Sequence, residues 1–438
     1  MKNFISKIIF ILSDIVIISL AIYLAYILHL SFKSVDLDTF PLIKYLSFYP
    51  LYIFPILLFS YEGIYTYRYD FWHESRLILK VTILSIILIF SYLAMTKTTE
   101  NYSRFVIGFT FVIMAVLVPL FKNICKKLLF KLGAWQKTAK IHGEDAFLTK
   151  EIYRNPYLGY IQPKPDEEAT TIFINSKDSD PEDLKRLISL HIQNKHEVVF
   201  IPLVDDYDLT YSHIYGLSNT RTNLIVFKNR LKSSYQLLFK RISDLLLSLI
   251  FFPFLLLIML YIAYRIKRTE PQKDIFFTQE RLGKNGVPFV CYKFRTMYEN
   301  SEDLLQQYLQ EHPEEIEYYN AYHKYKNDPR ITKIGQWLRR TSLDELPQIF
   351  NVFKNEMSLI GPRPYMLNEK EKIGENVDTI LTVKPGVTGL WQVSGRSDLD
   401  FISRVRLDTW YLRNWNLWMD LVILIKTVKT VLFKDGAK

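Results

Sequence analysis

The apolar run LLLSLIFFPFLLLIMLYIA at residues 245–263 decides the fold class. Its length approaches the roughly 20 residues that a helix needs to cross a bilayer, and Pro253 lies near its centre. Basic residues flank both ends, namely Lys240, Arg241, Arg265, Lys267 and Arg268. Because basic flanks favour the cytoplasmic side, the run predicts a re-entrant helix over about residues 242–264 that breaks at Pro253. The alternative is a fifth ordinary span, kinked at the proline, with everything after it outside the cytoplasm.

Four earlier apolar runs of similar length predict four transmembrane helices. They lie at residues 8–30, 45–61, 77–95 and 105–121. The first is too long for the apolar part of a signal peptide and contains Asp14, so the N-terminus is expected to stay attached. Lysines and arginines gather on one side of these runs, which places both ends of the bundle in the cytoplasm. Residues 1–136 therefore predict a four-helix membrane bundle.

Residues 137–230 have a mixed polar and apolar composition that predicts a small α/β domain. Runs typical of strands at 171–174 and 197–201 lie on either side of a helical pattern at 181–194. The segment begins with only Gly143 where a dinucleotide-binding domain would have G-x-G-x-x-G. We therefore expect a degenerate Rossmann-like domain that acts as a scaffold or dimer domain and binds no nucleotide.

The net charge of +10 is compatible with nucleic acid, anionic lipid or a phosphorylated substrate as partner. The basic residues follow the ends of the apolar runs and the motifs described below, which favours membrane lipid and phosphate over nucleic acid. The two cysteines, Cys125 and Cys291, are far apart and belong to no CxxC pattern. The sequence therefore supports neither a disulfide scaffold nor a structural zinc site.

Residues 231–438 predict a mainly helical catalytic domain, because charged residues and glycine turns are combined there. The segment FVCYKFRTM at 289–297 alternates apolar and polar residues, which places Lys293 and Arg295 on one face of a strand. Two cations on one face suit a phosphate group. The alternative is a strand face covered by solvent.

The segment LRRTSLDELPQ at 338–348 carries adjacent carboxylates, Asp344 and Glu345. One carboxylate can attack a phosphorus atom while the other holds a divalent metal such as Mg²⁺, and Arg339 supplies donors for phosphate oxygens. The alternative is structural, because Ser342 and Glu345 have the spacing of a capping box at a helix N-terminus. Both interpretations can hold together, since a helix N-terminus also binds anions.

Two further loops carry candidate binding residues. In SLIGPRP at 358–364, the prolines and the glycine fix a rigid turn around Arg363, which suits phosphate recognition. In KPGVTGLWQVSGRS at 384–397, Gln392 and Arg396 offer donors beside three glycines, so this loop is a candidate nucleotide or sugar pocket.

From Lys240 onward the chain resembles the bacterial sugar transferases, the monotopic polyprenyl-phosphate phosphoglycosyl transferases. The motifs KFRTM, TSLDELPQ, GPRP and PGVTGLWQVSGRS occur in the family's order. The four-helix start, the α/β middle segment and the phrase YLRNWNLWMDL at 411–421 look like the large, galactose-type branch. Two departures are the Phe252 that precedes Pro253, where the family usually has serine, and the missing glycine-rich loop.

The resemblance implies a two-step reaction. Asp344 would attack the sugar-proximal phosphate of a UDP-sugar, release UMP and carry the phosphosugar, which undecaprenyl phosphate would then accept. Glu345 would hold Mg²⁺, and Lys293, Arg339 and Arg363 would match the family's phosphate-handling positions. Pro253 would match the break in its re-entrant helix.

The resemblance also implies a setting and a partner. It places the chain in the bacterial inner membrane with the catalytic domain on the cytoplasmic face, as a homodimer that starts synthesis of a surface polysaccharide. Galactose is preferred over glucose as the sugar. A membrane scaffold that binds polyprenyl lipid without turning it over is the rival from another class, and the intact Asp344-Glu345 pair argues against it.

Overall fold

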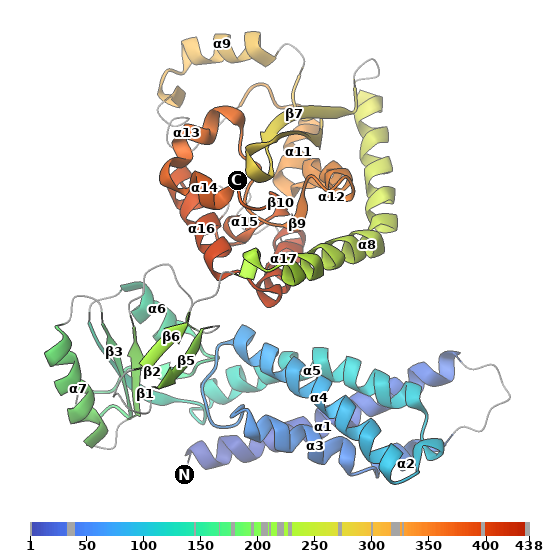
Figure 1. Ribbon diagram of the computed structural model, residues 1–438, viewed down its shortest axis with the longest axis vertical. Coiled ribbons are helices and arrows are strands. Elements are labelled where there is room, and N and C mark those ends of the chain that lie inside the picture. The colour runs from blue at the N-terminus through green and yellow to red at the C-terminus, as the bar shows by residue number, and fades with distance from the viewer. Residues whose placement is uncertain are drawn as a thin grey trace. The chain divides into compact units, whose positions relative to one another are not determined.

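The chain divides into two compact units, Met1–Val204 and Asp205–Lys438, in a computed structural model (Figure 1). The structure describes residues 2–32, 40–143, 146–165, 167–176, 180–193, 197–202, 209, 212–216, 223–226, 230–269, 274–298, 301–316, 325, 328–395 and 399–433. Within this part, five helical segments are long and apolar enough to cross a membrane. They are Ile5–Phe32, Leu42–Tyr61, Phe71–Met95, Arg104–Lys131 and Ser234–Thr269. The five predicted apolar runs are thus confirmed as helical, and the chain is a mostly helical membrane protein with a small parallel sheet.

Long helices form the first part of the first unit. They are α1 (Lys2–Phe32), α2 (Leu42–Leu46), α3 (Pro50–Tyr61), α4 (Phe71–Met95), the 3₁₀ helix η1 (Thr99–Asn101) and α5 (Arg104–Lys131). The second apolar run is divided into α2 and α3 because Pro50, which has no N–H to continue a helix, begins α3. The apolar core of this bundle includes Ile18, Ile78 and Phe111, each with no exposed surface.

Two buried ion pairs lie among these apolar side chains. Lys122 Nζ is 2.9 Å from Asp14 Oδ2, which also accepts a hydrogen bond from the Tyr65 hydroxyl at 2.6 Å. Lys126 pairs with Glu74 in the same way. A buried charge is tolerated only with a partner of opposite charge, so these pairs hold α1, α4 and α5 in one register.

A four-stranded parallel sheet with strand order β2-β1-β3-β4 follows the bundle. Its elements are β1 (Lys137–His142), α6 (Ala146–Arg154), β2 (Tyr160–Ile161), β3 (Thr171–Asn175), α7 (Pro181–Gln193) and β4 (Glu197–Ile201). The predicted strands and the helix between them are confirmed, with shifts of one residue at two of their ends. The parallel pairing agrees with the α/β interpretation of this segment.

Arg68 joins the end of the bundle to this sheet within the first unit. Its Nη1 atom donates to the carbonyls of Leu158 (2.7 Å) and Gly159 (3.1 Å), and its guanidinium lies 3.9 Å from the ring centroid of Trp135. Gly159 has a φ of 70°, and a side chain there would collide with both Arg68 and the Trp135 carbonyl. The close approach therefore requires glycine.

The second unit begins with β5 (His213–Gly216) and β6 (Asn223–Val226), an antiparallel pair, and then η3 (Arg230–Lys232) and α8 (Ser234–Thr269). The helix α8 extends beyond the expected 242–264 at both ends, and Pro253 lies inside it. In Figure 1 its ribbon changes direction sharply between its two halves. A proline removes one backbone hydrogen bond and bends a helix without ending it, which explains a continuous but bent element.

The rest of the second unit consists of short elements that carry the motifs. They are β7 (Phe276–Leu282), η4 (Lys284–Gly286), β8 (Pro288–Phe294), α9 (Ser301–Glu311), α11 (Lys333–Thr341), η5 (Leu343–Gln348), α12 (Ile349–Phe353), β9 (Ser358–Ile360), η6 (Leu367–Glu369), α13 (Lys370–Ile373), η7 (Gly374–Asn376), α14 (Val377–Ile380), β10 (Gly386–Thr388), α15 (Leu390–Val393), α16 (Phe401–Asn414) and α17 (Leu417–Phe433). The antiparallel pair β7-β8 and the parallel pair β9-β10 are the sheets among them.

The two faces of α8 have different surroundings. Met259, Ile262 and Ile266 are buried and belong to one core with Phe294 and Leu338. The opposite face exposes large apolar side chains along its whole length, including Leu238, Leu249, Phe254, Leu257 and Leu260. An exposed apolar surface of this extent indicates contact with lipid.

We predict that Arg68→Ala lowers the free energy of unfolding by about 3 kcal/mol, because two carbonyls lose a charged donor. The measurement is thermal unfolding of the detergent-solubilised chain. Lys127→Ala, which removes an exposed cation from the neighbouring helix α5, is the matched control and should change little. Equal melting temperatures for the two variants would contradict the role given to Arg68.

Candidate active site

The adjacent carboxylates Asp344 and Glu345 lie in the 3₁₀ helix η5, between α11 and α12. Ser342 ends α11 with a φ of 56°, in the left-handed region, and makes no capping hydrogen bond through its side chain. The capping-box interpretation is therefore wrong, because a capping residue needs an extended backbone to aim its hydroxyl at the helix N–H groups. The sharp turn at Ser342 instead places both carboxylates at the start of a new short helix.

Lys293 on β8 contacts Glu345 directly. Its Nζ atom lies 2.7 Å from Glu345 Oε1, and both side chains are about three-quarters buried. Burial alone would raise the pKa of Glu345, but Lys293, Arg363 and Arg281 outweigh it and lower that pKa overall. Glu345 is therefore held as a carboxylate, and Lys293 as its ammonium partner.

Asp344 has the opposite shift. Burial raises its pKa to about 6, the negative charge of Glu345 adds to the increase, and Lys293 and Arg339 oppose it. Two neighbouring carboxylates with pKa values moved in opposite directions are typical of sites where acids divide their roles. The opposite pKa shifts therefore support this pair as candidate catalytic residues, in addition to the sequence motif.

A hydrogen bond to Thr296 holds the side chain of Arg339, which lies on α11. Its Nε atom donates to Thr296 Oγ1 at 2.9 Å, and its charge reaches Asp344. The helix can come this close because Gly335 packs against the backbone of Thr296, where a Cβ atom would lie 2.1 Å from the carbonyl oxygen. The glycine therefore sets the position of the guanidinium.

Arg363 follows β9 in the rigid turn predicted for it. Its backbone N–H donates to Asp408 Oδ2 at 3.0 Å, and the same oxygen accepts the Tyr365 hydroxyl at 2.9 Å. Its guanidinium lies 3.3 Å from Glu369 Oε1 and 6.0 Å from the ring centroid of Trp391. Burial raises the pKa of Asp408 to about 7, although both donors favour its ionised form. The turn is thus fixed through its backbone and its side chain.

Arg281 on β7 is a candidate that the sequence analysis missed. It is buried, donates to the carbonyl of Pro364 at 3.1 Å, and lowers the pKa of Glu345. In the β7-β8 register Phe277 faces Lys293, so Arg281, four residues further on, lies on the same face as Lys293. The sequence does contain a signal for this position, because the glycine-containing turn at 283–286 lies between two strand-like runs and predicts a hairpin. Such a hairpin would bring Arg281 to the same face as Lys293.

The remaining predicted site residues are placed differently. Arg295 pairs with the exposed Asp274 at 3.7 Å. Gln392 lies on α15, and its amide is 3.4 Å from the Val387 carbonyl. Arg396 lies outside the described residues. The structure thus brings Asp344, Glu345 and Lys293 together, whereas the contact found for Gln392 is with Val387 and not with this group.

The donor set fits a magnesium ion only in combination with a substrate. The described residues contain no group of three His, Cys, Asp or Glu side chains that would enclose a metal by themselves. Mg²⁺ is commonly held by one or two carboxylates together with substrate phosphates and water. Asp344 and Glu345 supply such oxygens, with Lys293 on only one oxygen of Glu345. The pair therefore fits a cation that arrives with phosphate.

Comparison with known proteins finds a family model and several relatives. A family model described as "Bacterial sugar transferase" matches residues 235–434. The undecaprenyl-phosphate galactose phosphotransferase of Salmonella typhimurium is 34% identical, over 85% of this chain and 84% of that protein. The UDP-galactose-lipid carrier transferase of Erwinia amylovora is 31% identical, over 85% and 84%. The UDP-glucose:undecaprenyl-phosphate glucose-1-phosphate transferase of Klebsiella pneumoniae is 31% identical, over 64% and 58%.

We predict that Lys293→Gln destabilises the protein by about 2 kcal/mol at neutral pH, because it leaves the Glu345 carboxylate partly buried without its closest cation. Without Lys293, the effect of burial on Glu345 is opposed only by Arg363 and Arg281, so its pKa is expected to rise. Protonation then relieves the penalty, so the difference in melting temperature from wild type should shrink as the pH falls toward about 4.

Thermal unfolding from acid to neutral pH measures this difference. Lys372→Gln removes an exposed lysine on α13 and serves as the control, with no change expected at any pH. A Lys293→Gln penalty that is constant across the pH range would show that lost packing, and not the charge of Glu345, is responsible.

Proposed function

The chain belongs to the bacterial sugar transferase family, and we propose that it transfers hexose 1-phosphate from a UDP-sugar to undecaprenyl phosphate. Galactose 1-phosphate is the proposed group, because the Salmonella and Erwinia relatives, which match most of this chain, are named for galactose. The products are undecaprenyl-diphosphate-sugar and UMP, in the first membrane step of surface polysaccharide synthesis. The observation that carries the proposal is the partly buried Asp344-Glu345 pair beside Lys293, in the unit that also contains the apolar helix α8.

The proposed reaction has two steps. A carboxylate oxygen of Asp344 attacks the sugar-proximal phosphorus, the bond from that phosphorus to the bridging oxygen breaks, and UMP leaves with that oxygen. A phosphate oxygen of the polyprenyl lipid then attacks the same phosphorus and releases the Asp344 carboxylate. A covalent intermediate allows one site to meet a soluble donor and a lipid acceptor in turn.

The nearby cations have distinct parts in this scheme. Lys293 keeps Glu345 ionised and lies where it can neutralise a phosphate oxygen. The positive charge of Arg339 acts on Asp344, and that of Arg281 acts on Glu345. Arg363 adds a guanidinium whose backbone is fixed by a hydrogen bond to Asp408. Such preorganised donors stabilise charge that develops on the transferred phosphate. Arg295 is assigned to the nucleotide side of the same phosphates, next to Lys293 on the chain.

We assign Mg²⁺ to Glu345, with Asp344 beside it. When bound, the ion would neutralise diphosphate charge and make UMP a better leaving group. Gln392 and Arg396 are proposed to contact the nucleotide or the sugar.

The proposed setting is the bacterial inner membrane. Four spans from the first unit would anchor the chain, and α8 would enter and leave on the cytoplasmic face, because its bend at Pro253 and its two basic flanks suit re-entry. This places Asp344 on the cytoplasmic side, where UDP-sugars are made. We propose a homodimer as the working form.

We predict that the purified chain, with Mg²⁺ and undecaprenyl phosphate, releases UMP from one UDP-hexose in a panel that includes UDP-galactose and UDP-glucose. Asp344→Asn should lower the rate by about a thousandfold or more, since the nucleophile is lost. Asp378→Asn, an exposed carboxylate on α14, is the matched control. Chelation of the metal should abolish release as well.

The outcomes separate the proposal from its rivals. Release from UDP-glucose alone would change the sugar and keep the reaction. Full activity in Asp344→Asn would refute the covalent route. Polyprenyl binding without release from any UDP-sugar would favour the scaffold interpretation.

The pH dependence provides a second test. Asp344 must be ionised to attack, and burial raises its pKa to about 6. We therefore predict that kcat/KM for the UDP-sugar rises with pH through about 6 and is level above about 7. A profile that is flat down to pH 4, or that falls through this range, would contradict the assignment of Asp344 as nucleophile.

A further inference from the structure

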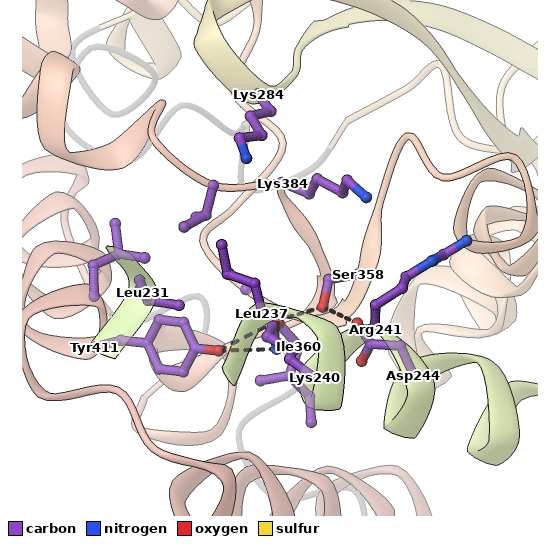
Figure 2. Close-up of a pocket in the computed structure, with 13 residues that line it drawn as sticks. Leu231, Leu237, Lys240, Arg241, Asp244, Lys284, Ser358, Ile360, Lys384 and Tyr411 are labelled. Atoms are coloured by element: carbon purple, nitrogen blue, oxygen red, sulfur yellow. Dashed lines mark hydrogen bonds between the residues drawn. The ribbon is translucent and has the colours of Figure 1, made fainter. Parts of the chain in front are cut away.

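A cavity of about 110 Å³ lies at the start of α8. Its walls come from the first turns of α8, from η4, from β9, from α16 and from the segment before β10. Figure 2 shows Arg241, Lys284 and Lys384 on three of these separate segments. None of the residues that line it belongs to the group of Asp344, Glu345, Lys293 and Arg339.

Two of the charges in the cavity already have partners. Lys240 Nζ lies 2.7 Å from Asp420 Oδ2, so its charge is neutralised inside the protein. Asp244 accepts a hydrogen bond from the Ser358 hydroxyl at 2.7 Å, as the dashed line in Figure 2 marks. The floor of the cavity is therefore a satisfied network that needs no ligand.

The other three cations form no ion pair among the described residues, although the charge of Asp244 acts on Arg241 and Lys384 from a longer distance. Arg241 donates to the carbonyl of Val352 at 2.9 Å, and Lys384 donates to the side-chain oxygen of Asn355. No described residue accepts a hydrogen bond from the Lys284 ammonium or forms an ion pair with it. Asp244 is the one carboxylate among the described lining residues.

The three cations are close enough to repel one another. Burial lowers the pKa of Lys384, the positive charges of Arg241 and Lys284 lower it further, and the negative charge of Asp244 opposes this without reversing it. Positive charges gathered around a small cavity attract an anion, which would relieve this repulsion. The cavity is too small for a nucleotide and large enough for one phosphate group.

We propose that Arg241, Lys284 and Lys384 form a second anion site, which binds the phosphate headgroup of a membrane lipid. We assign the phosphate to a lipid because of the helix α8, which forms one wall of the cavity. Close to Arg241, α8 exposes Leu238, Phe239 and Ile242, so an acyl or prenyl chain attached to the phosphate has an apolar surface to follow. A guanidinium and two ammonium groups supply the donors that phosphate oxygens need.

The test measures lipid binding directly and needs no turnover, so it does not depend on the proposed function. The full chain in detergent is mixed with phosphatidylglycerol or with phosphatidylcholine, and bound lipid is counted by native mass spectrometry. Wild type should retain phosphatidylglycerol about tenfold more than phosphatidylcholine, a difference of about 1.4 kcal/mol. The double variant Lys284→Gln with Lys384→Gln should lose this preference.

Two controls separate charge from folding. Lys284→Arg with Lys384→Arg keeps the charges and should keep the preference, whereas loss in this variant would overturn the proposal. Lys372→Gln removes a lysine from the surface of the same unit and should behave as wild type.

A parallel arm distinguishes lipid from free phosphate. Millimolar inorganic phosphate is added without lipid, and the melting temperature is recorded for wild type and for the Gln double variant. Stabilisation of wild type alone, without any preference for phosphatidylglycerol, would move the site to a soluble phosphate and overturn the lipid assignment. Equal phosphatidylglycerol binding by wild type and the Gln double variant would refute the anion site itself.

Discussion

The ion pair between Lys240 and Asp420 holds the apolar helix α8 to the rest of the unit that also carries the carboxylate pair. Its N···O distance is 2.7 Å, and Lys240 also donates to the Ile360 carbonyl at 2.9 Å. Asp420 accepts from the Tyr411 hydroxyl and from the indole N–H of Trp415. Removing two charges from water costs several kcal/mol unless hydrogen bonds satisfy them, and here both are satisfied. One buried pair thereby fixes α8 against β9, α16 and α17.

The position of the site follows from this anchor. Ser358, the first residue of β9, bonds to Asp244 on α8, so the strand is tied to the helix at both of its ends. The chain then turns through the segment that carries Arg363, whose backbone bonds to Asp408 on α16. A guanidinium suited to phosphate and a helix suited to lipid therefore share one rigid frame. A reaction between a soluble donor and a lipid acceptor requires such a frame.

The sequence predicted those features that single segments determine. Apolar length gave the membrane helices, and alternation gave the strand with Lys293, because burial selects the residue type at each position. Asp408 could not be found in this way, since its role depends on Arg363 and Tyr365, which only the tertiary fold brings near. The Ser342 turn was mistaken because left-handed helix ends usually carry Gly or Asn, so a serine followed three residues later by glutamate pointed to a capping box instead.

The division of contacts between the two carboxylates suits the proposed chemistry. Lys293 makes its hydrogen bond to Glu345 and reaches Asp344 only through its charge. A carboxylate held tightly by an ammonium group is stabilised and is therefore a weaker nucleophile. Asp344 has a pKa raised to about 6, so at neutral pH it is mostly ionised yet less stabilised than Glu345. The same lysine thus keeps one acid as a fixed anion and leaves the other able to attack.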